Sequence, residues 1–392
     1  MKLYYLFCNG SRGDCEPAVS LAQYMIVKGN RVRIYSNQKN KKFLEKSEID
    51  HNIILKNYIF RQPEEVTSLE YYDEFKNSII YHIDLINSID EKPDVVIGMG
   101  DQLGKFLAEK FSVPYYQLVL QYYQTPNYAS NTSFVENILE TLEKWYRQLF
   151  SKNELNYFNN IRKDLGLKEI HDFNEYIFEN ENVIIANSMI LSNFNYIKHE
   201  KVFISGNINL YKPLDNNIEQ VEGLSEFLSK DTNYIYLNLG SMSQNLDNEL
   251  ISLYLKAFKN LNCRVIIGCN KKELPKNNNF FYCDSINQHQ LFPKMKLIIQ
   301  CGGLGTVFKA AYHGIPQLII PKNFEEPFWG EKIKELGIGE SISFYELSSE
   351  KLKNSVNRIL NSKNIYYNCE LLSNYIDING AKNIYDFICN SI

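Results

Sequence analysis

A glycine-rich segment is the part of this sequence best suited to bind an anion. Leu297–Gln300 reads as a buried strand, and a helix pattern begins near Thr306. Between them lie Gly302, Gly303 and Gly305. The first N–H groups of a helix are unpaired and favour phosphate, and glycine lets the backbone approach because no Cβ intervenes. Thr306 could cap the helix or donate to the same oxygens. Any tight strand-to-helix turn also favours glycine, so a plain connection is the alternative.

Polar residues follow the next apolar run as well. Gly314–Pro321 predicts another buried strand, and Glu325, Glu326 and Trp329 come soon after it. In open α/β sheets, ligands bind outside the carboxyl ends of the strands. We therefore expect both segments to border one crevice, which makes Gln300–Trp329 the candidate binding segment.

Asp14 follows the first apolar run and could serve as a general base. A carboxylate at that position could accept the proton of an attacking hydroxyl, provided that burial or a charged neighbour raises its pKa. The spacing equally allows Asp14 to cap a helix that we expect to open at Pro17. Arg12 could reach a diphosphate with its fork of donors, or it could pair with Glu16.

Strand and helix patterns alternate along most of the chain, which predicts an α/β fold with parallel sheets. A polar stretch, 211–233, separates two such series and is the predicted linker. We expect a first domain at 1–210 and a second at 234–392. The last helix pattern, which begins at Gly380, is a candidate to cross back to the first domain.

Composition narrows the functional class. The 392 residues are 44% hydrophobic and carry a net charge of −4, so a globular protein without nucleic-acid partners is expected. No apolar run approaches the roughly 20 residues of a membrane-spanning helix. We expect a cytoplasmic protein with reduced cysteines, for which peripheral membrane contact stays open. No pair of acidic residues suited to holding Mg²⁺ follows a strand, so metal independence is predicted.

Several motifs, in order along the chain, resemble one family. Gln300–Thr306, Ala310–Pro316, Glu325–Trp329 and Leu336–Gly339 are similar to the donor-binding signature of glycosyltransferase family 1, the UDP-glycosyltransferase superfamily. Gly10–Pro17 resembles the GSRGD loop of bacterial antibiotic and sterol glycosyltransferases. The resemblance implies a GT-B fold, in which two Rossmann-like domains with parallel sheets face each other across a cleft. It also implies inverting transfer of a hexose, with the acceptor held by the N-terminal domain and the donor by the C-terminal domain.

The resemblance also assigns roles to residues. Asp14 matches the family's candidate base, and Leu239–Ser241 and Ile286–Leu291 match nucleotide-contacting stretches. No cofactor is expected beyond a UDP- or TDP-hexose co-substrate, with a small and apolar hydroxyl acceptor as the second partner. The expected donor-binding residues are Arg12, Ser241, Ser285, Ile286, Asn287, Gln300, Gly302, Gly303, Gly305, Thr306, Glu325 and Glu326. An aromatic stretch after a strand of the first domain could line the acceptor pocket with Tyr122, Tyr123 and Gln124, although this chain has 28 Tyr and 23 Phe throughout.

Two departures from the family pattern leave alternatives open. Gln300 stands where the family usually has a histidine against the donor phosphate, and it can donate an N–H but carries no charge. Glu325 and Glu326 stand where Asp-Gln is common. A weakly active or non-catalytic nucleotide-sugar-binding protein is therefore one alternative, and a nucleotide-sugar epimerase with the same fold is another.

Overall fold

The computed structural model describes residues 1–8, 10–55, 85–99, 102–120, 152–171, 176, 182–192, 202–209, 214–230, 232–238, 248–259, 261–268, 278–283, 285–322 and 326–392. The chain forms two compact units. The first consists of Met1–Met189, Asn193–Lys212 and Asp377–Ile392, and the second of Ile190–Ser192 and Pro213–Ile376.

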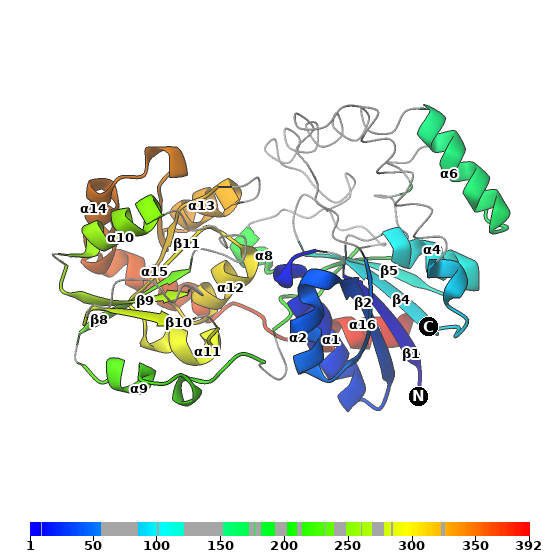
Figure 1. Cartoon of the computed structure of the whole chain (residues 1–392), viewed down its shortest axis with the longest axis horizontal. Helices are drawn as coiled ribbons and strands as arrows, with labels where there is room; N and C mark the ends of the chain where they lie inside the picture. The colour runs from blue at the N-terminus through cyan, green and yellow to red at the C-terminus, as the bar shows by residue number, and fades with distance from the viewer. Residues whose placement is uncertain are drawn as a thin grey trace. The chain divides into compact units, whose positions relative to one another are not determined.

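The first unit is built on a seven-stranded sheet with the order β3-β2-β1-β4-β5-β6-β7, in which every pairing is parallel (Figure 1). Its strands are β1 (Leu3–Cys8), β2 (Arg31–Asn37), β3 (Asp50–Leu55), β4 (Val95–Met99), β5 (Tyr115–Val119), β6 (Val183–Ile185) and β7 (Val202–Ile204). Every residue of β1 and β4 is buried, as the continuous apolar runs predicted.

The second unit holds a six-stranded parallel sheet with the order β10-β9-β8-β11-β12-β13. Its strands are β8 (Asn233–Asn238), β9 (Cys263–Gly268), β10 (Phe280–Cys283), β11 (Leu297–Gln300), β12 (Gln317–Ile319) and β13 (Gly339–Ser341). The predicted α/β class with two parallel sheets is therefore confirmed.

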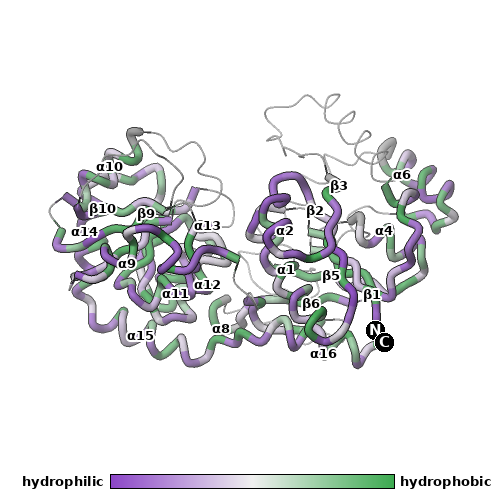
Figure 2. Tube along the Cα trace, turned by 60° about the horizontal axis from the view of Figure 1, so that its bottom comes forward, coloured by the Kyte–Doolittle hydropathy of each residue, from purple (hydrophilic) through white to green (hydrophobic). Residues whose placement is uncertain are grey.

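Helices connect the strands, and those at the surface carry hydrophobic and hydrophilic residues along their length (Figure 2). In the first unit they are α1 (Arg12–Val27), η1 (Gln38–Asn40), α2 (Lys41–Ser47), α4 (Gln102–Phe111), α6 (Lys152–Asp164) and α16 (Gly380–Ser391). In the second they are η5 (Ile218–Gln220), α9 (Leu224–Phe227), α10 (Asn248–Phe258), α11 (Gln288–Leu291), η6 (Phe292–Lys294), α12 (Leu304–Tyr312), α13 (Glu326–Glu335), η7 (Phe344–Glu346), α14 (Ser349–Leu360) and α15 (Lys363–Ser373). α8 (Met189–Ser192) spans a boundary between the units.

The last helix, α16, belongs to the first unit. It packs against α1, and Asn30 donates to the Tyr385 hydroxyl at 3.1 Å. The chain ends therefore lie near each other within that unit (Figures 1 and 2).

Most of the predicted linker, 211–233, falls in the second unit, which includes every residue from Pro213 to Ile376. Ile218, Leu224 and Phe227 are buried in the core that also contains Tyr234. The range is polar overall, but these three apolar side chains anchor two short helical segments, η5 and α9, to the core of the second unit.

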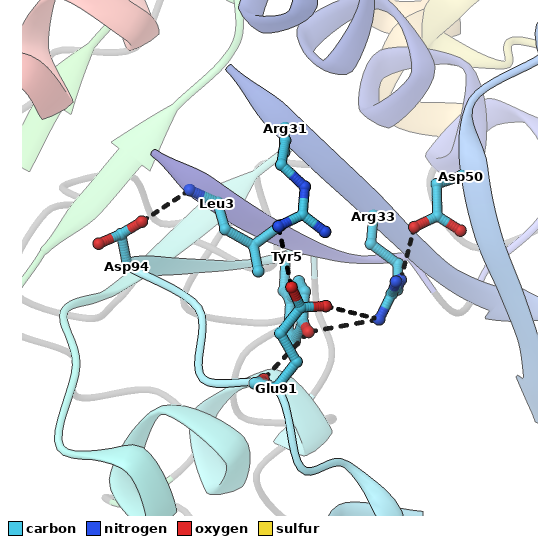
Figure 3. A network of polar contacts seen from close by, with 7 residues as sticks. All are labelled: Leu3, Tyr5, Arg31, Arg33, Asp50, Glu91 and Asp94. Atoms are coloured by element: carbon cyan, nitrogen blue, oxygen red, sulfur yellow. Dashed lines mark hydrogen bonds and ion pairs between the residues drawn. The ribbon is translucent and has the colours of Figure 1, made fainter. Parts of the chain in front are cut away.

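A polar network ties the strands of the first sheet to the segment before β4 (Figure 3). Glu91 lies 2.9 Å from Arg31 and 3.4 Å from Arg33, and Arg33 also contacts Asp50 at 2.7 Å. Asp94 accepts the Leu3 N–H at 2.7 Å. These contacts hold β1 in register, so that its carboxyl end presents the residues that follow it.

The seven cysteines in the described ranges are free, and all but Cys389 are buried. Within the same ranges, no helix is long and apolar enough to cross a membrane. Nor does the described part of the chain contain a group of three or more His, Cys, Asp or Glu residues suited to a metal ion.

Candidate functional site

Each sheet has one point at which the strand order reverses. In the first it lies between β1 and β4, and in the second between β8 and β11. Crevices that bind ligands in open α/β sheets form outside the carboxyl ends of strands at such points. The two segments predicted to carry chemistry, Gly10–Asp14 and Gly302–Thr306, directly follow β1 and β11.

Helix α1 begins at Arg12, with Ser11 as its N-cap, and not at Pro17 as the sequence suggested. Ser11 Oγ accepts the Gly13 N–H at 3.2 Å, and the Asp14 carboxylate accepts the Ser11 N–H at 2.8 Å. This reciprocal capping box starts the helix ahead of the proline and leaves Pro17 inside it. Asp14 is thus not the N-cap itself but the partner that closes the box.

Asp14 is partly buried and its carboxylate is held in place. Oδ2 accepts from the backbone N–H of Ser11 and, at 3.2 Å, from its hydroxyl. Burial raises the pKa of Asp14 above its usual value, and the Ser11 hydrogen bonds offset only part of that rise. The raised pKa is what a carboxylate needs in order to act as a base near neutrality.

Gly10 makes room for this carboxylate. A Cβ on Gly10 would lie 1.9 Å from Asp14 Oδ2, so any side chain there would displace it. Arg12, in contrast, already has partners in the first unit: its guanidinium lies 3.6 Å from the Glu16 carboxylate on the same helix and 4.7 Å from the centre of the Phe43 ring on α2. The pairing with Glu16, one of the two expectations for Arg12, is the one that the structure contains.

The predicted anion site lies at the start of α12, which Gly303 caps with its backbone alone. The N–H groups of Thr306 and Val307 bond to Gly303 O, at 3.0 and 3.1 Å, whereas those of Leu304 and Gly305 have no partner among the described residues. A Cβ on Gly303 or Gly305 would meet nothing within 4 Å. Two free donors at the positive end of a helix, with open space over the glycines, form an arrangement that binds phosphate.

Gly302 plays a different part from its two neighbours. Its φ is +113°, and a Cβ there would lie 3.0 Å from the backbone oxygen of Glu326. The Glu326 carboxylate accepts the N–H of Lys322 at 2.6 Å and so closes the loop before α13. Gly302 therefore allows the turn to pack against α13, and Glu326 already has a structural partner.

Gln300 is 3% exposed, and its amide is bonded within the sheet. The carbonyl oxygen of Val307 can only accept, so the Nε2 group that lies 3.0 Å from it must belong to Gln317 as the donor. The Oε1 atom of Gln317 then faces Gln300 and accepts from Gln300 Nε2 at 2.7 Å. Gln300 Oε1 is buried without a partner among the described residues. We expected this amide to donate to a phosphate, but the structure uses Nε2 inside the fold.

Asn238 was missed by the sequence analysis. It ends β8, stands in register with Gln300, and donates to Thr306 Oγ1 at 3.3 Å. A polar residue that closes an apolar strand next to the switch point was the signal that could have identified it.

The expected donor-binding residues 285–287 already contact other parts of the second unit. Ser285 Oγ donates to Asp215 at 2.6 Å, and the Asn287 N–H donates to Asn216 O at 2.8 Å. Ile286 is buried in the core. The predicted residues Ser241, Glu325, Tyr122, Tyr123 and Gln124 lie outside the described ranges.

Comparison with known proteins agrees with this geometry. Residues 253–375 match the model of the erythromycin biosynthesis protein CIII-like C-terminal domain. Glycosyltransferase GtfC of Amycolatopsis orientalis is 23% identical over 359 residues, which cover 85% of this chain and 84% of that protein. Sterol 3-beta-glucosyltransferase UGT80A2 of Arabidopsis thaliana is 30% identical over 160 residues, but these are 39% of this chain and only 25% of that protein. The solved structure of glycosyltransferase VinC in complex with dTDP superimposes with a TM-score of 0.68 at 16% identity and covers 98% of both chains.

The chain therefore has the GT-B fold, and its sequence is similar to those of glycosyltransferases of the UDP-glycosyltransferase superfamily.

Proposed function

We propose that this protein is an inverting glycosyltransferase that moves a hexose from a UDP- or TDP-sugar to a hydroxyl of a small, apolar acceptor. The observation that carries the proposal is the start of α12, where the Leu304 and Gly305 N–H groups have no partner among the described residues and lie beside open glycines. A nucleoside diphosphate is the ligand that this arrangement and the family have in common. The dTDP bound to VinC supports a nucleotide-sugar donor for this chain too.

The proposed reaction is a single displacement. Asp14 accepts the proton of the acceptor hydroxyl while the hydroxyl oxygen forms a bond to the anomeric carbon of the donor sugar. The bond from that carbon to the diphosphate oxygen breaks, and attack from the opposite face inverts the centre. The free amides of α12 stabilise the negative charge that develops on the departing diphosphate. Each step uses a group that this chain supplies.

The acceptor class rests on the relatives. The sterol 3-beta-glucosyltransferase is named for a sterol, and the matching family model is named for erythromycin biosynthesis. A natural product, a lipid or a sterol-like alcohol is therefore the proposed acceptor.

The test substitutes the base without changing its shape. Asp14→Asn should lower acceptor-dependent release of UDP or TDP by about a hundredfold or more, in line with the loss of a general base. The rise in melting temperature on adding UDP or TDP should persist, since the second unit holds the donor site. Asp386→Asn is the matched control because that exposed carboxylate on α16 forms a surface ion pair with Lys382. A wild-type rate for Asp14→Asn would remove Asp14 from the mechanism.

A second candidate is a nucleotide-sugar-binding protein with little or no turnover. It is favoured by the engagement of two predicted donor ligands inside the fold, Gln300 with Gln317 and Glu326 with Lys322. Acceptor-dependent release of UDP or TDP would reject it. Formation of an altered nucleotide-sugar without any acceptor would instead indicate an epimerase.

A further inference from the structure

A buried polar network lies beneath the loop that carries Asp14. The carbonyl oxygen of Gly10 accepts two side-chain amides, Asn37 Nδ2 at 2.9 Å and Asn40 Nδ2 at 3.1 Å. Both asparagines are almost fully buried, with exposed fractions of 6% and 2%. Asn37 ends β2 and Asn40 ends η1, so a neighbouring strand and turn together hold this one carbonyl.

The orientation of each amide follows from its other partners. Asn37 Oδ1 accepts the Lys39 N–H at 3.0 Å, which leaves only its NH₂ group to face Gly10. Asn40 also donates to Ser36 Oγ at 3.1 Å, and Ser36 in turn donates to the carbonyl of Cys8 at 2.7 Å. The network therefore links the last residue of β1 to the Gly10 carbonyl in the loop that follows, and the donor and acceptor of each hydrogen bond are defined.

One peptide group links this network to Asp14. The Gly10 carbonyl and the Ser11 N–H belong to the same planar peptide, in which they point in opposite directions. With the carbonyl fixed by two donors, the N–H is directed at Asp14 Oδ2, 2.8 Å away. Donation to the carbonyl also polarises the peptide and strengthens the bond that its N–H makes.

We infer that Asn37 and Asn40 are positioning residues for Asp14: they set the direction and strength of the Ser11 N–H bond and so hold the carboxylate in its reactive orientation. The inference rests on the proposed role of Asp14 as the base. Both asparagines act on Asp14 through the Gly10–Ser11 peptide, whose carbonyl they hold.

Burial raises the pKa of Asp14, and the backbone N–H of Ser11 is the largest of the influences that oppose this rise. The described elements around it contribute the titratable groups Cys8 and Cys15, Arg12 and Glu16, and the exposed Lys39 and Lys41. Arg12 and Glu16 pair with each other. The hydrogen bond between Cys8 and Cys15, together with burial, raises the pKa of Cys8, so this thiol stays neutral while Asp14 titrates.

The experiment compares Asn37→Ala and Asn40→Ala with Asn30→Ala, a matched control. Asn30 also joins separate elements by donating to Met25 O and the Tyr385 hydroxyl, and it precedes β2, whereas Asn37 ends that strand. Rates are measured with UDP-glucose or TDP-glucose, whichever raises the melting temperature, and with the most reactive of cholesterol, 4-methylumbelliferone and water.

Each network variant should lower kcat about three- to tenfold, with the KM of the nucleotide-sugar unchanged, and the acid limb of the pH–rate profile should move to higher pH. The direction follows because a weaker N–H bond to the carboxylate favours its protonated form. The pKa of Asp14 itself should rise in the same variants. It is measured by carbon-13 NMR of the whole chain labelled at aspartate, with the Asp14 signal assigned from its loss in Asp14→Asn. The NMR measurement does not depend on enzyme turnover. Each single variant keeps one of the two donors to the Gly10 carbonyl, so if one variant fails to fold, the other still tests the inference.

An unshifted Asp14 pKa and acid limb in both variants, equal to those of Asn30→Ala, would overturn the inference even if the variants were less stable. That outcome differs from failure of the proposed function, in which Asp14→Asn itself would keep the wild-type rate.

Discussion

The three glycines before and within the start of α12 should respond to alanine in opposite ways. Gly302 has a φ of +113° and a backbone oxygen 3.0 Å from the position of an added Cβ. Gly303 has an ordinary φ of −66°, and at both Gly303 and Gly305 an added Cβ meets nothing within 4 Å. We therefore expect Gly302→Ala to damage the fold, whereas Gly303→Ala and Gly305→Ala damage ligand binding.

The expected magnitudes follow from these geometries. Backbone strain at Gly302 costs about 1–3 kcal/mol and the close contact with Glu326 about 1 kcal/mol more. In a unit of this size each kcal/mol lowers the melting temperature by about 2–4 °C, so Gly302→Ala should lose about 5–15 °C. Gly303→Ala should stay within about 1 kcal/mol of wild type, and Gly305→Ala should be neutral or slightly stabilising, since alanine is the better helix former.

Binding should change in the reverse order. A Cβ at Gly303 or Gly305 occupies the space through which a diphosphate would approach the free amides. A tenfold weaker nucleotide would lose about 1.4 kcal/mol of ligand stabilisation at saturation, which is about 3–6 °C of the ligand-induced shift.

The assay is differential scanning fluorimetry of the full chain with and without UDP and TDP. A full ligand-induced shift in both Gly303→Ala and Gly305→Ala would refute the assignment of the anion site. A wild-type melting temperature for Gly302→Ala without nucleotide would refute the strain argument.

Three further outcomes can be checked directly. Arg162 is 3% exposed and forms a two-pronged pair with Glu109 at 2.7 and 3.0 Å, so Glu109→Gln should lower the free energy of unfolding in urea by about 3 kcal/mol, and a loss below 1 kcal/mol would contradict this. Burial lowers the pKa of His313, whose Nε2 lies 3.0 Å from His289 Nδ1. The unfolded chain therefore binds more protons than the folded chain, and the free energy of unfolding should fall as the pH drops below about 6.5. In His313→Gln this dependence on pH should be weaker. Transfer should persist in excess chelator, and loss of turnover that Mg²⁺ restores would show that the predicted metal independence is wrong.

Much of the fold could be predicted from the sequence because buried positions recur with the period of the helix or strand that contains them. Continuous apolar runs such as Leu297–Gln300 predict strands covered on both faces, and the glycines that follow mark a tight turn into a helix. Since parallel strands present their carboxyl ends at one edge, the sequence predicts the candidate anion site at the end of the strand that the structure has as β11. The boundaries were less certain, because the Ser11–Asp14 capping box, and not Pro17, starts α1.

Only the tertiary structure determines which buried polar groups form hydrogen bonds with each other. Gln300 was expected to face a phosphate, but its amide pairs with Gln317 from the next strand. Asn37 and Asn40 reach the Gly10 carbonyl from 27 and 30 residues away. Periodicity reports whether a residue is buried, whereas a buried polar side chain takes whatever partner the assembled strands bring within about 3 Å, and that choice is made by register and packing together.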